Sequence, residues 1–226
     1  YPPVLKAKEL LDSGAIGEPS VVRFHSVEGG SVESPQFAMD AGAGVWRRDP
    51  TLNPGGLVMD DGVHKYATAM KWIGDIEKVF GIVTKTDDYI LELPSAIIWK
   101  FKDKDCLGVF DIVFAPGMTI RGKYFAVDEY MEIHGSKGSI HVTRLTSEVH
   151  DLPPVLLVKG NETQGFDVPS DYIESFNGAA NDFIDSIIED RKPDMDAEFG
   201  KKTVQVALAI YEAARTESVA YPSSMV

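Results

Sequence analysis

The sequence predicts an α+β fold with a mostly antiparallel β-sheet, and three observations lead to this class. The hydrophobic pattern gives the order helix, strand, long loop, helix, a run of strands and two final helices, which does not alternate as βαβ units do. The 226 residues are 44% hydrophobic and 25% charged, which is typical of a soluble globular chain that can bury a sizeable core. The pattern contains no internal repeat or low-complexity tract.

The helices are predicted from their apolar faces and their end signals. Residues 2–13 form the first helix, with proline in its first turn and Gly14 just past its end. Residues 57–73 form the second, which Gly74 ends. Its apolar stripe consists of Met59, Val63, Tyr66, Met70 and Ile73. Two further stripes predict the closing helices: Ile173, Phe176, Ala180, Phe183 and Ile187, and then Val204, Leu208, Tyr211 and Ala214.

The strand candidates are rich in Val, Ile and Phe and lie between turn residues. They are residues 20–27, 76–85, 95–102, 106–115, 127–134, 138–144 and 154–159. Residues 108–114 are apolar on both faces, which predicts a central strand covered on both sides. The apolar strands exceed what three main helices can cover, so we expect a homodimer or higher homo-oligomer that buries a sheet face.

Charge and cysteine content exclude several classes of protein. With 22 Lys and Arg against 35 Asp and Glu, the net charge of −13 disfavours nucleic acids and anionic membranes as partners. No apolar run approaches the roughly 20 residues that span a bilayer, and we expect a cytoplasmic protein. The single cysteine, Cys106, excludes an internal disulfide framework and a Cys-based metal site. Because Tyr1-Pro2 follows no initiator Met or signal peptide, we expect a piece of a longer protein.

Nucleotide-binding motifs do not occur in the chain. The nearest approach to GxGxxG, residues 42–47, lacks the third glycine and does not open a helix after a strand. Neither a Walker A loop nor a Gly-x-Ser-x-Gly elbow occurs. We therefore expect no nicotinamide cofactor to bind tightly to these residues alone.

The run from Gly55 to His64 is the strongest chemical signal. On a helix Asp60 and His64 are four residues apart and project from one face, and Asp61 is three residues from His64. A carboxylate that holds an imidazole makes it a general base. Two other readings fit the same spacing. One is a surface Asp–His pair that only supports the helix, and the other is a metal site, which would need a further ligand.

A glycine-rich loop at residues 29–56 precedes this helix, and long loops often carry function. It contains Trp46 and Arg47. Trp offers a flat apolar face for a sugar ring, and Arg offers donors for hydroxyl or carboxylate groups. An ordinary loop anchor, with Trp46 in the core and Arg47 solvated, fits the sequence equally well.

Several motifs together resemble the Gfo/Idh/MocA oxidoreductases, in the order in which that family has them. They are residues 3–17, Trp46-Arg47-x-Asp49-Pro50, Gly55 to His64, Trp72-Ile73-Gly74, residues 133–140, residues 183–186 and residues 207–214. Each motif is loose alone, but the ordered set is specific and covers the chain nearly end to end. The matching part is the family's C-terminal domain, so residues 1–226 resemble its substrate-binding and oligomerisation domain, a large open sheet with helices packed on one face.

The resemblance implies NAD(P)-dependent oxidation or reduction of a sugar, cyclitol or related polyol. His64 would be the general base and Asp60 would orient it, while Trp46, Arg47 and Asp61 would contact substrate. The family's N-terminal Rossmann domain, which binds NAD or NADP, is absent from these residues, so no residue here is expected to bind cofactor and this piece alone would be inactive. Two alternatives stay open: a non-catalytic scaffold that dimerises, and a metal-dependent hydrolase or lyase that uses Asp60, Asp61 and His64.

Overall fold

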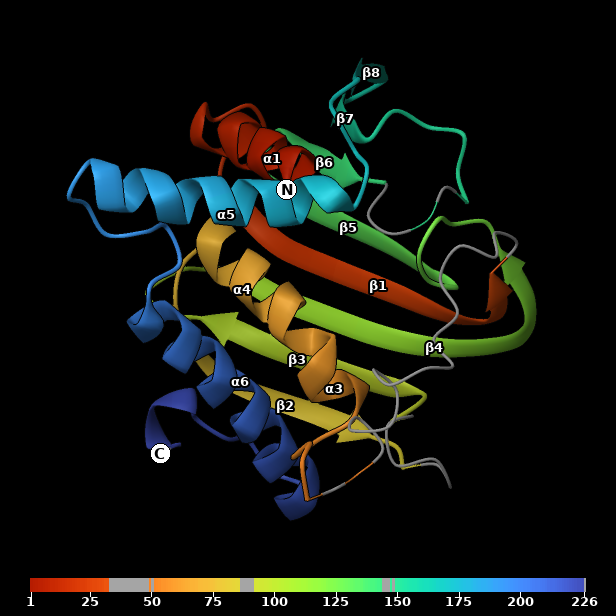
Figure 1. Ribbon diagram of the computed structural model, residues 1–226, viewed down its shortest axis with the longest axis vertical. Helices are drawn as coiled ribbons and strands as arrows, with labels where there is room; N and C mark the ends of the chain where they lie inside the picture. The colour runs from red at the N-terminus through yellow and green to blue at the C-terminus, as the bar shows by residue number, and fades with distance from the viewer. Residues whose placement is uncertain (33–48, 50, 86–91, 144–146, 148, 226) are drawn as a thin grey trace.

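An eight-stranded β-sheet spans the molecule, in the order β2-β3-β4-β1-β5-β6-β7-β8 (Figure 1). The computed structural model describes residues 1–32, 49, 51–85, 92–143, 147 and 149–225. Strands β1 and β4 pair in parallel, and all other neighbours in this order pair antiparallel. The strands are β1 (Pro19–Val32), β2 (Ile76–Val83), β3 (Ser95–Phe101), β4 (Leu107–Ile120), β5 (Val127–Gly135), β6 (Gly138–Val142), β7 (Val155–Lys159) and β8 (Glu162–Phe166).

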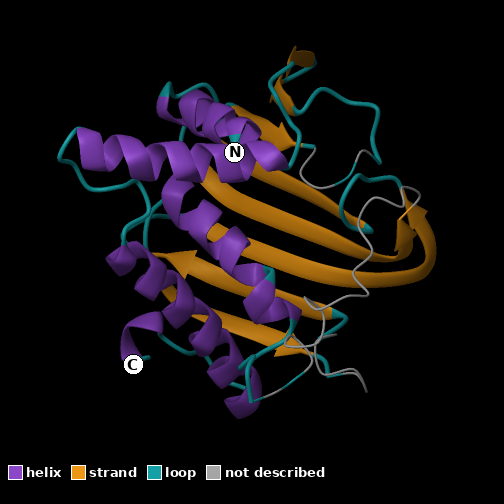
Figure 2. Cartoon of the chain, in the orientation of Figure 1, coloured by secondary structure: helices purple, strands orange, loops and turns teal. Residues whose placement is uncertain are grey.

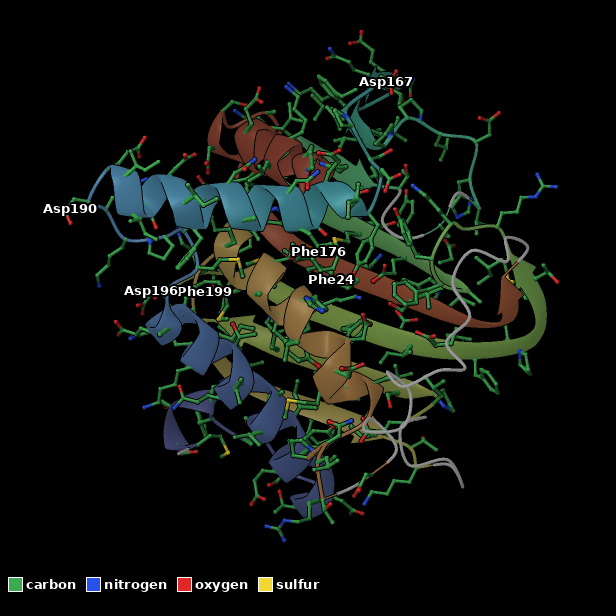
Figure 3. All side chains as sticks on the ribbon, in the orientation of Figure 1. Phe24, Asp167, Phe176, Asp190, Asp196 and Phe199 are labelled. Atoms are coloured by element: carbon green, nitrogen blue, oxygen red, sulfur yellow. The ribbon has the colours of Figure 1, made fainter. Side chains whose placement is uncertain are left out.

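The helices lie together on one face of this sheet, as Figure 2 shows in purple against orange. They are α1 (Pro2–Asp12), α3 (Leu57–Asp60), α4 (Gly62–Trp72), α5 (Ile173–Ile188) and α6 (Ala197–Thr216), followed by the short 3-10 helix η1 (Pro222–Ser224). Asp196 caps the start of α6: its carboxylate accepts a hydrogen bond of 2.9 Å from the Phe199 N–H, and Figure 3 labels both residues. The α+β class and the mostly antiparallel sheet are confirmed.

An aromatic cluster fixes α4 on the sheet. Phe24 of β1 stacks on Trp72 of α4 with ring centroids 5.8 Å apart, and it lies 6.0 Å from Trp99 of β3. Tyr66 of α4 meets Trp99 and Phe110 edge-on, at 6.1 and 6.2 Å. All five side chains are buried. Aromatic pairs in these geometries stabilise a core beyond the area they bury, so the position of α4 is defined by rigid neighbours.

The second predicted helix is confirmed, with one interruption. Helix α3 ends at Asp60 and α4 begins at Gly62, so Asp61 is the break between them. The apolar stripe contacts the core: Tyr66 and Met70 are buried, and Met59, Val63 and Ile73 pack against them. Gly74 follows with φ of 130°, a backbone conformation that favours glycine and stops the helix.

Among the described residues, no second layer covers the sheet face opposite the helices. Leu107 and Ile98 on that face are 51% and 53% exposed, and Ile82 and Val113 are exposed as well. The expectation that residues 108–114 are covered on both sides is therefore wrong for this chain. Phe110 and Ile112 are buried under the helices, but the alternate side chains face outward because no second layer of the described residues covers them.

Helix α5 forms as predicted, but its apolar stripe is not buried. Phe183 and Ile187 are 60% and 66% exposed, and Ile173 and Phe176 are also exposed. Figure 1 shows this helix on the outer side of the helical layer, in front of α1 and α4. An apolar stripe of this size indicates a missing partner.

Two further results concern single elements. Strand β8 was not predicted, because residues 162–166 have no apolar alternation and are mostly exposed at the edge of the sheet. No helix among the described residues is long and apolar enough to span a membrane.

Candidate active site

The turn before α3 is anchored by a buried carboxylate. Glu92 accepts a hydrogen bond of 3.0 Å from the Val58 N–H and one of 2.8 Å from the Tyr211 hydroxyl. The first of these satisfies an N–H group at the start of a helix, where no helical partner exists. Burial and the adjacent Glu92 raise the pKa of Tyr211, so its hydroxyl stays a donor. This anchor ties the start of α3 to α6.

The glycines of the Gly55-to-His64 run allow close approach by two tyrosines. A Cβ at Gly55 would lie 2.3 Å from the Tyr211 hydroxyl oxygen, and one at Gly62 would lie 2.5 Å from that of Tyr66. The Tyr66 hydroxyl donates to the Val58 carbonyl at 3.1 Å. A side chain at either glycine would force its tyrosine away. These glycines thus hold the loop and both short helices against the core.

Asp60 and His64 lie on either side of the Asp61 break. The His64 N–H donates to the Asp61 carbonyl at 3.1 Å, so the helical path continues through the break with a tighter turn. Asp60 is half-buried and His64 is exposed, which leaves the imidazole accessible to a ligand. Among the described residues no hydrogen bond joins the His64 imidazole to Asp60 or to Asp61.

Lys65 forms a buried ion-pair bridge beside this histidine. Its ammonium group contacts Oδ1 of Asp61, which immediately precedes α4, and Oε1 of Glu129 on β5. Lys65 is 2% exposed and Glu129 is buried. Burial alone would lower the pKa of Lys65, but the two carboxylates outweigh burial and raise it, so Lys65 stays charged. The bridge joins the first turn of α4 to β5.

Glu28 lies on β1, and the charges of Asp61, Lys65 and Glu129 act on its carboxyl group. Burial, followed by the negative charges of Asp61 and Glu129, raises the pKa of Glu28 to about 8, although Lys65 opposes the shift. The Glu28 carboxyl therefore carries a proton at neutral pH. Tyr172, just before α5, belongs to the same environment: burial and then Glu129 raise its pKa, and Asp60 and Asp61 contribute.

Aromatic side chains pack against Tyr172. The Tyr172 ring lies 5.6 Å from that of Tyr124 and 5.8 Å from that of Phe125. Asp171 fixes this corner, because it accepts hydrogen bonds from the Tyr124 hydroxyl at 2.7 Å and from Lys123 at 2.9 Å. Flat apolar rings beside carboxylates are suited to polyhydroxylated ligands.

The sequence identified only part of this environment. The predicted substrate residues Trp46 and Arg47 lie outside the described residues. Lys65, Glu129, Glu28 and Tyr172 were missed. The four-residue spacing of Asp61 and Lys65 could have suggested an ion pair, but not its burial. Glu28 and Glu129 gave no signal, since their proximity depends on the register in which Ser26 faces Glu129 across β1 and β5.

The described residues give little support to the metal reading. No group of three His, Cys, Asp or Glu side chains in the described ranges has the proximity that a metal ion needs. Asp61, one of the three residues that reading requires, uses Oδ1 to bind Lys65.

Comparison with known proteins identifies the class to which this fold and site belong. Residues 4–141 match the model of the GFO/IDH/MocA C-terminal domain, which is more than half of the chain. The chain belongs to the Gfo/Idh/MocA family.

Individual relatives agree with this assignment. A D-xylose 1-dehydrogenase [NADP(+)] of Haloarcula marismortui is 25% identical over 222 residues, which are 96% of this chain and 56% of that protein. An oxidoreductase from Agrobacterium radiobacter, solved with NAD+, L-tartaric acid and magnesium, has a TM-score of 0.77 at 18% identity, over 99% of this chain and 63% of its own. A scyllo-inositol dehydrogenase from Lactobacillus casei, solved with NAD(H) and scyllo-inositol, has a TM-score of 0.67 at 20% identity, over 98% and 62%. The structural matches show a shared fold, and this chain spans about three-fifths of their length.

Proposed function

We propose that residues 1–226 are the substrate-binding and oligomerisation domain of an NAD(P)-dependent oxidoreductase that acts on a sugar, cyclitol or related polyol. The observation that carries the proposal is the accessible His64, placed by the glycine-anchored α3 and α4 in a chain of this family. The D-xylose and scyllo-inositol dehydrogenases among its relatives support the substrate class.

His64 acts as the general base in the proposed reaction. Its imidazole takes the proton of the reacting substrate hydroxyl as the carbon–oxygen double bond forms. Bound NAD(P) would accept the hydride from the same carbon. Asp60 orients the imidazole and stabilises its protonated form. The Tyr172 ring, which shares the electrostatic environment of Asp60 and Asp61, helps to exclude water from the substrate.

The nicotinamide nucleotide does not fit this chain. The chain contains no GxGxxG turn between a strand and a helix, and that turn is where a dinucleotide pyrophosphate binds. We infer that a separate Rossmann domain holds the cofactor and that the uncovered stripe of α5 contributes to the contact between domains. The exposure of Phe183 and Ile187 supports this arrangement.

A comparison of residues 1–226 with the natural longer polypeptide tests the proposal. Calorimetric titration with NADH and with NADPH should show no micromolar binding to residues 1–226, and binding of one of them to the longer protein. The longer protein should reduce its cofactor with a panel of polyols, followed at 340 nm. Micromolar binding by residues 1–226, or no polyol oxidation by a cofactor-bound longer protein, would contradict the proposal.

The uncovered sheet face supports a homodimer. Leu107 and Ile98 leave an apolar surface that a second copy would bury. Light scattering should therefore give at least twice the monomer mass, and Leu107→Asp should shift the protein towards monomer, because a buried carboxylate without a partner is costly. Leu52→Asp is the matched control, since Leu52 is 65% exposed and lies outside the sheet. A monomer at high concentration, or equal effects of the two variants, would show that this face is not the interface.

A further inference from the structure

Lys65 has no part in the proton transfer proposed above, yet it is nearly fully buried beside His64. Its bridge to Asp61 and Glu129 is an expensive way to attach a helix to a sheet, because apolar residues of similar volume stabilise such contacts as well or better. We therefore look for the role of the buried Lys65 ammonium group in its effect on nearby charged side chains rather than in stability.

Asp61 is the group that the bridge affects most directly. It is three residues from His64. Burial, followed by the charge of Glu129, raises the pKa of Asp61, while the charges of Lys65 and, more weakly, His64 oppose the shift. A carboxylate at this spacing can reach an imidazole on a helix. In the structure Asp61 Oδ1 binds Lys65 instead, and Asp61 Oδ2 is buried without a hydrogen-bond partner in the described part of the chain. Lys65 thus ties the Asp61 carboxylate to Glu129 of β5.

We propose that Lys65 is a positioning residue, which withdraws Asp61 from His64 so that Asp60 is the carboxylate that supports the base. This inference rests on the proposed function. It assigns Asp61 to the bridge rather than to substrate. Without Lys65, Asp61 would be free to turn and bind the protonated imidazole, and His64 would then keep its proton to higher pH.

Other charged and titratable groups face the bridge from each neighbouring element. Asp60 lies on α3, Glu28 on β1, Glu129 on β5 and Tyr172 at the start of α5. Glu28 and Tyr172 are uncharged at neutral pH because burial raises the pKa of each. Lys65 is the positively charged side chain that contacts Asp61 and Glu129 within this group. Its removal therefore makes the net charge of the group more negative.

The experiment is a double-mutant cycle on the full-length enzyme. In Lys65→Met the acid limb of the pH profile of kcat/KM should move to higher pH by about one unit, because a nearby carboxylate favours the protonated imidazole. Asp61→Asn alone should leave the limb in place, since Lys65 already withdraws that carboxylate. Lys65→Met/Asp61→Asn should return the limb to its wild-type position, and Lys65→Arg should not move it. A merely structural role would lower thermal stability and leave the limb unmoved.

Two measurements keep the test decisive. If Lys65→Met fails to fold, Lys65→Met/Glu129→Gln removes one charge of each sign and should show the same shift. The His64 imidazole can also be titrated by NMR without substrate, so a failure of the dehydrogenase proposal remains distinguishable from a failure of this one. An unshifted Lys65→Met, or a shift that persists in Lys65→Met/Asp61→Asn, would overturn the role of Lys65.

Discussion

His64→Ala should lower kcat of the full-length enzyme by about 10²–10⁴-fold, the usual contribution of general acid–base catalysis. The imidazole is accessible, and it lies on α4, whose first residue, Gly62, is in close contact with Tyr66; Glu92 and Gly55 fix the preceding helix α3. Stability should change little, because His64 is exposed. Steady-state kinetics and a thermal melt on the same preparation measure both quantities. A folded His64→Ala enzyme with turnover within about threefold of wild type would end the catalytic assignment.

Asp60→Asn is the companion variant. It should cost less than loss of the base and should shift the pH–rate profile, because the amide supports the imidazolium more weakly than the carboxylate does. If His64 and Asp60 were only a surface pair, both variants would lower stability slightly and leave turnover unchanged.

Gly108→Ala should destabilise the fold, because it overpacks the core. Overpacking usually costs about 1–3 kcal/mol, and we expect a value towards the upper end of this range. A Cβ at Gly108 on β4 would lie 1.8 Å from Trp99 Cε2. Trp99 cannot move aside easily, because it is buried and its ring lies 6.1 Å from Tyr66 and 6.2 Å from Phe101. For a domain of this size, each kcal/mol lowers Tm by about 2–4 °C.

Gly117→Ala on the same strand is the matched control for that prediction. A Cβ at Gly117 would meet no atom within 4 Å, so its Tm should stay close to that of the wild type. Differential scanning calorimetry on the three proteins measures the effect. Equal melting temperatures for Gly108→Ala and Gly117→Ala would show that the Trp99 contact does not limit the packing of the sheet.

Local pattern was sufficient to predict most of the secondary structure. The Met59-to-Ile73 stripe and the stop at Gly74 defined a helix because its periodicity and its end signals agree. The same reasoning could not predict whether a stripe is covered. The α5 stripe has an equally clear period, yet Phe183 is exposed, since burial depends on a partner that periodicity does not reveal.

The candidate site divides in the same way. Asp60 and His64 could be proposed from sequence because they are only four residues apart in the chain. Glu129 and Glu28 could not, since they come from two different strands and meet Lys65 only through the register of β1 and β5. A buried charge cluster forms only through tertiary packing. The spacing of its residues in the sequence therefore does not reveal that they meet.

The central position of β1 has a consequence for the order of folding. Its parallel neighbour, β4, contributes Asp111, which is 86 positions from His25 along the chain although their side chains are 2.5 Å apart. Loop closure over such separations slows folding and delays the non-local contacts that stabilise the product. During synthesis β1 therefore leaves the ribosome before β4 and β5, the two strands that pair with it, have been made. We expect this strand to be the segment that depends most on chaperones and aggregates most readily when translation stalls before β4.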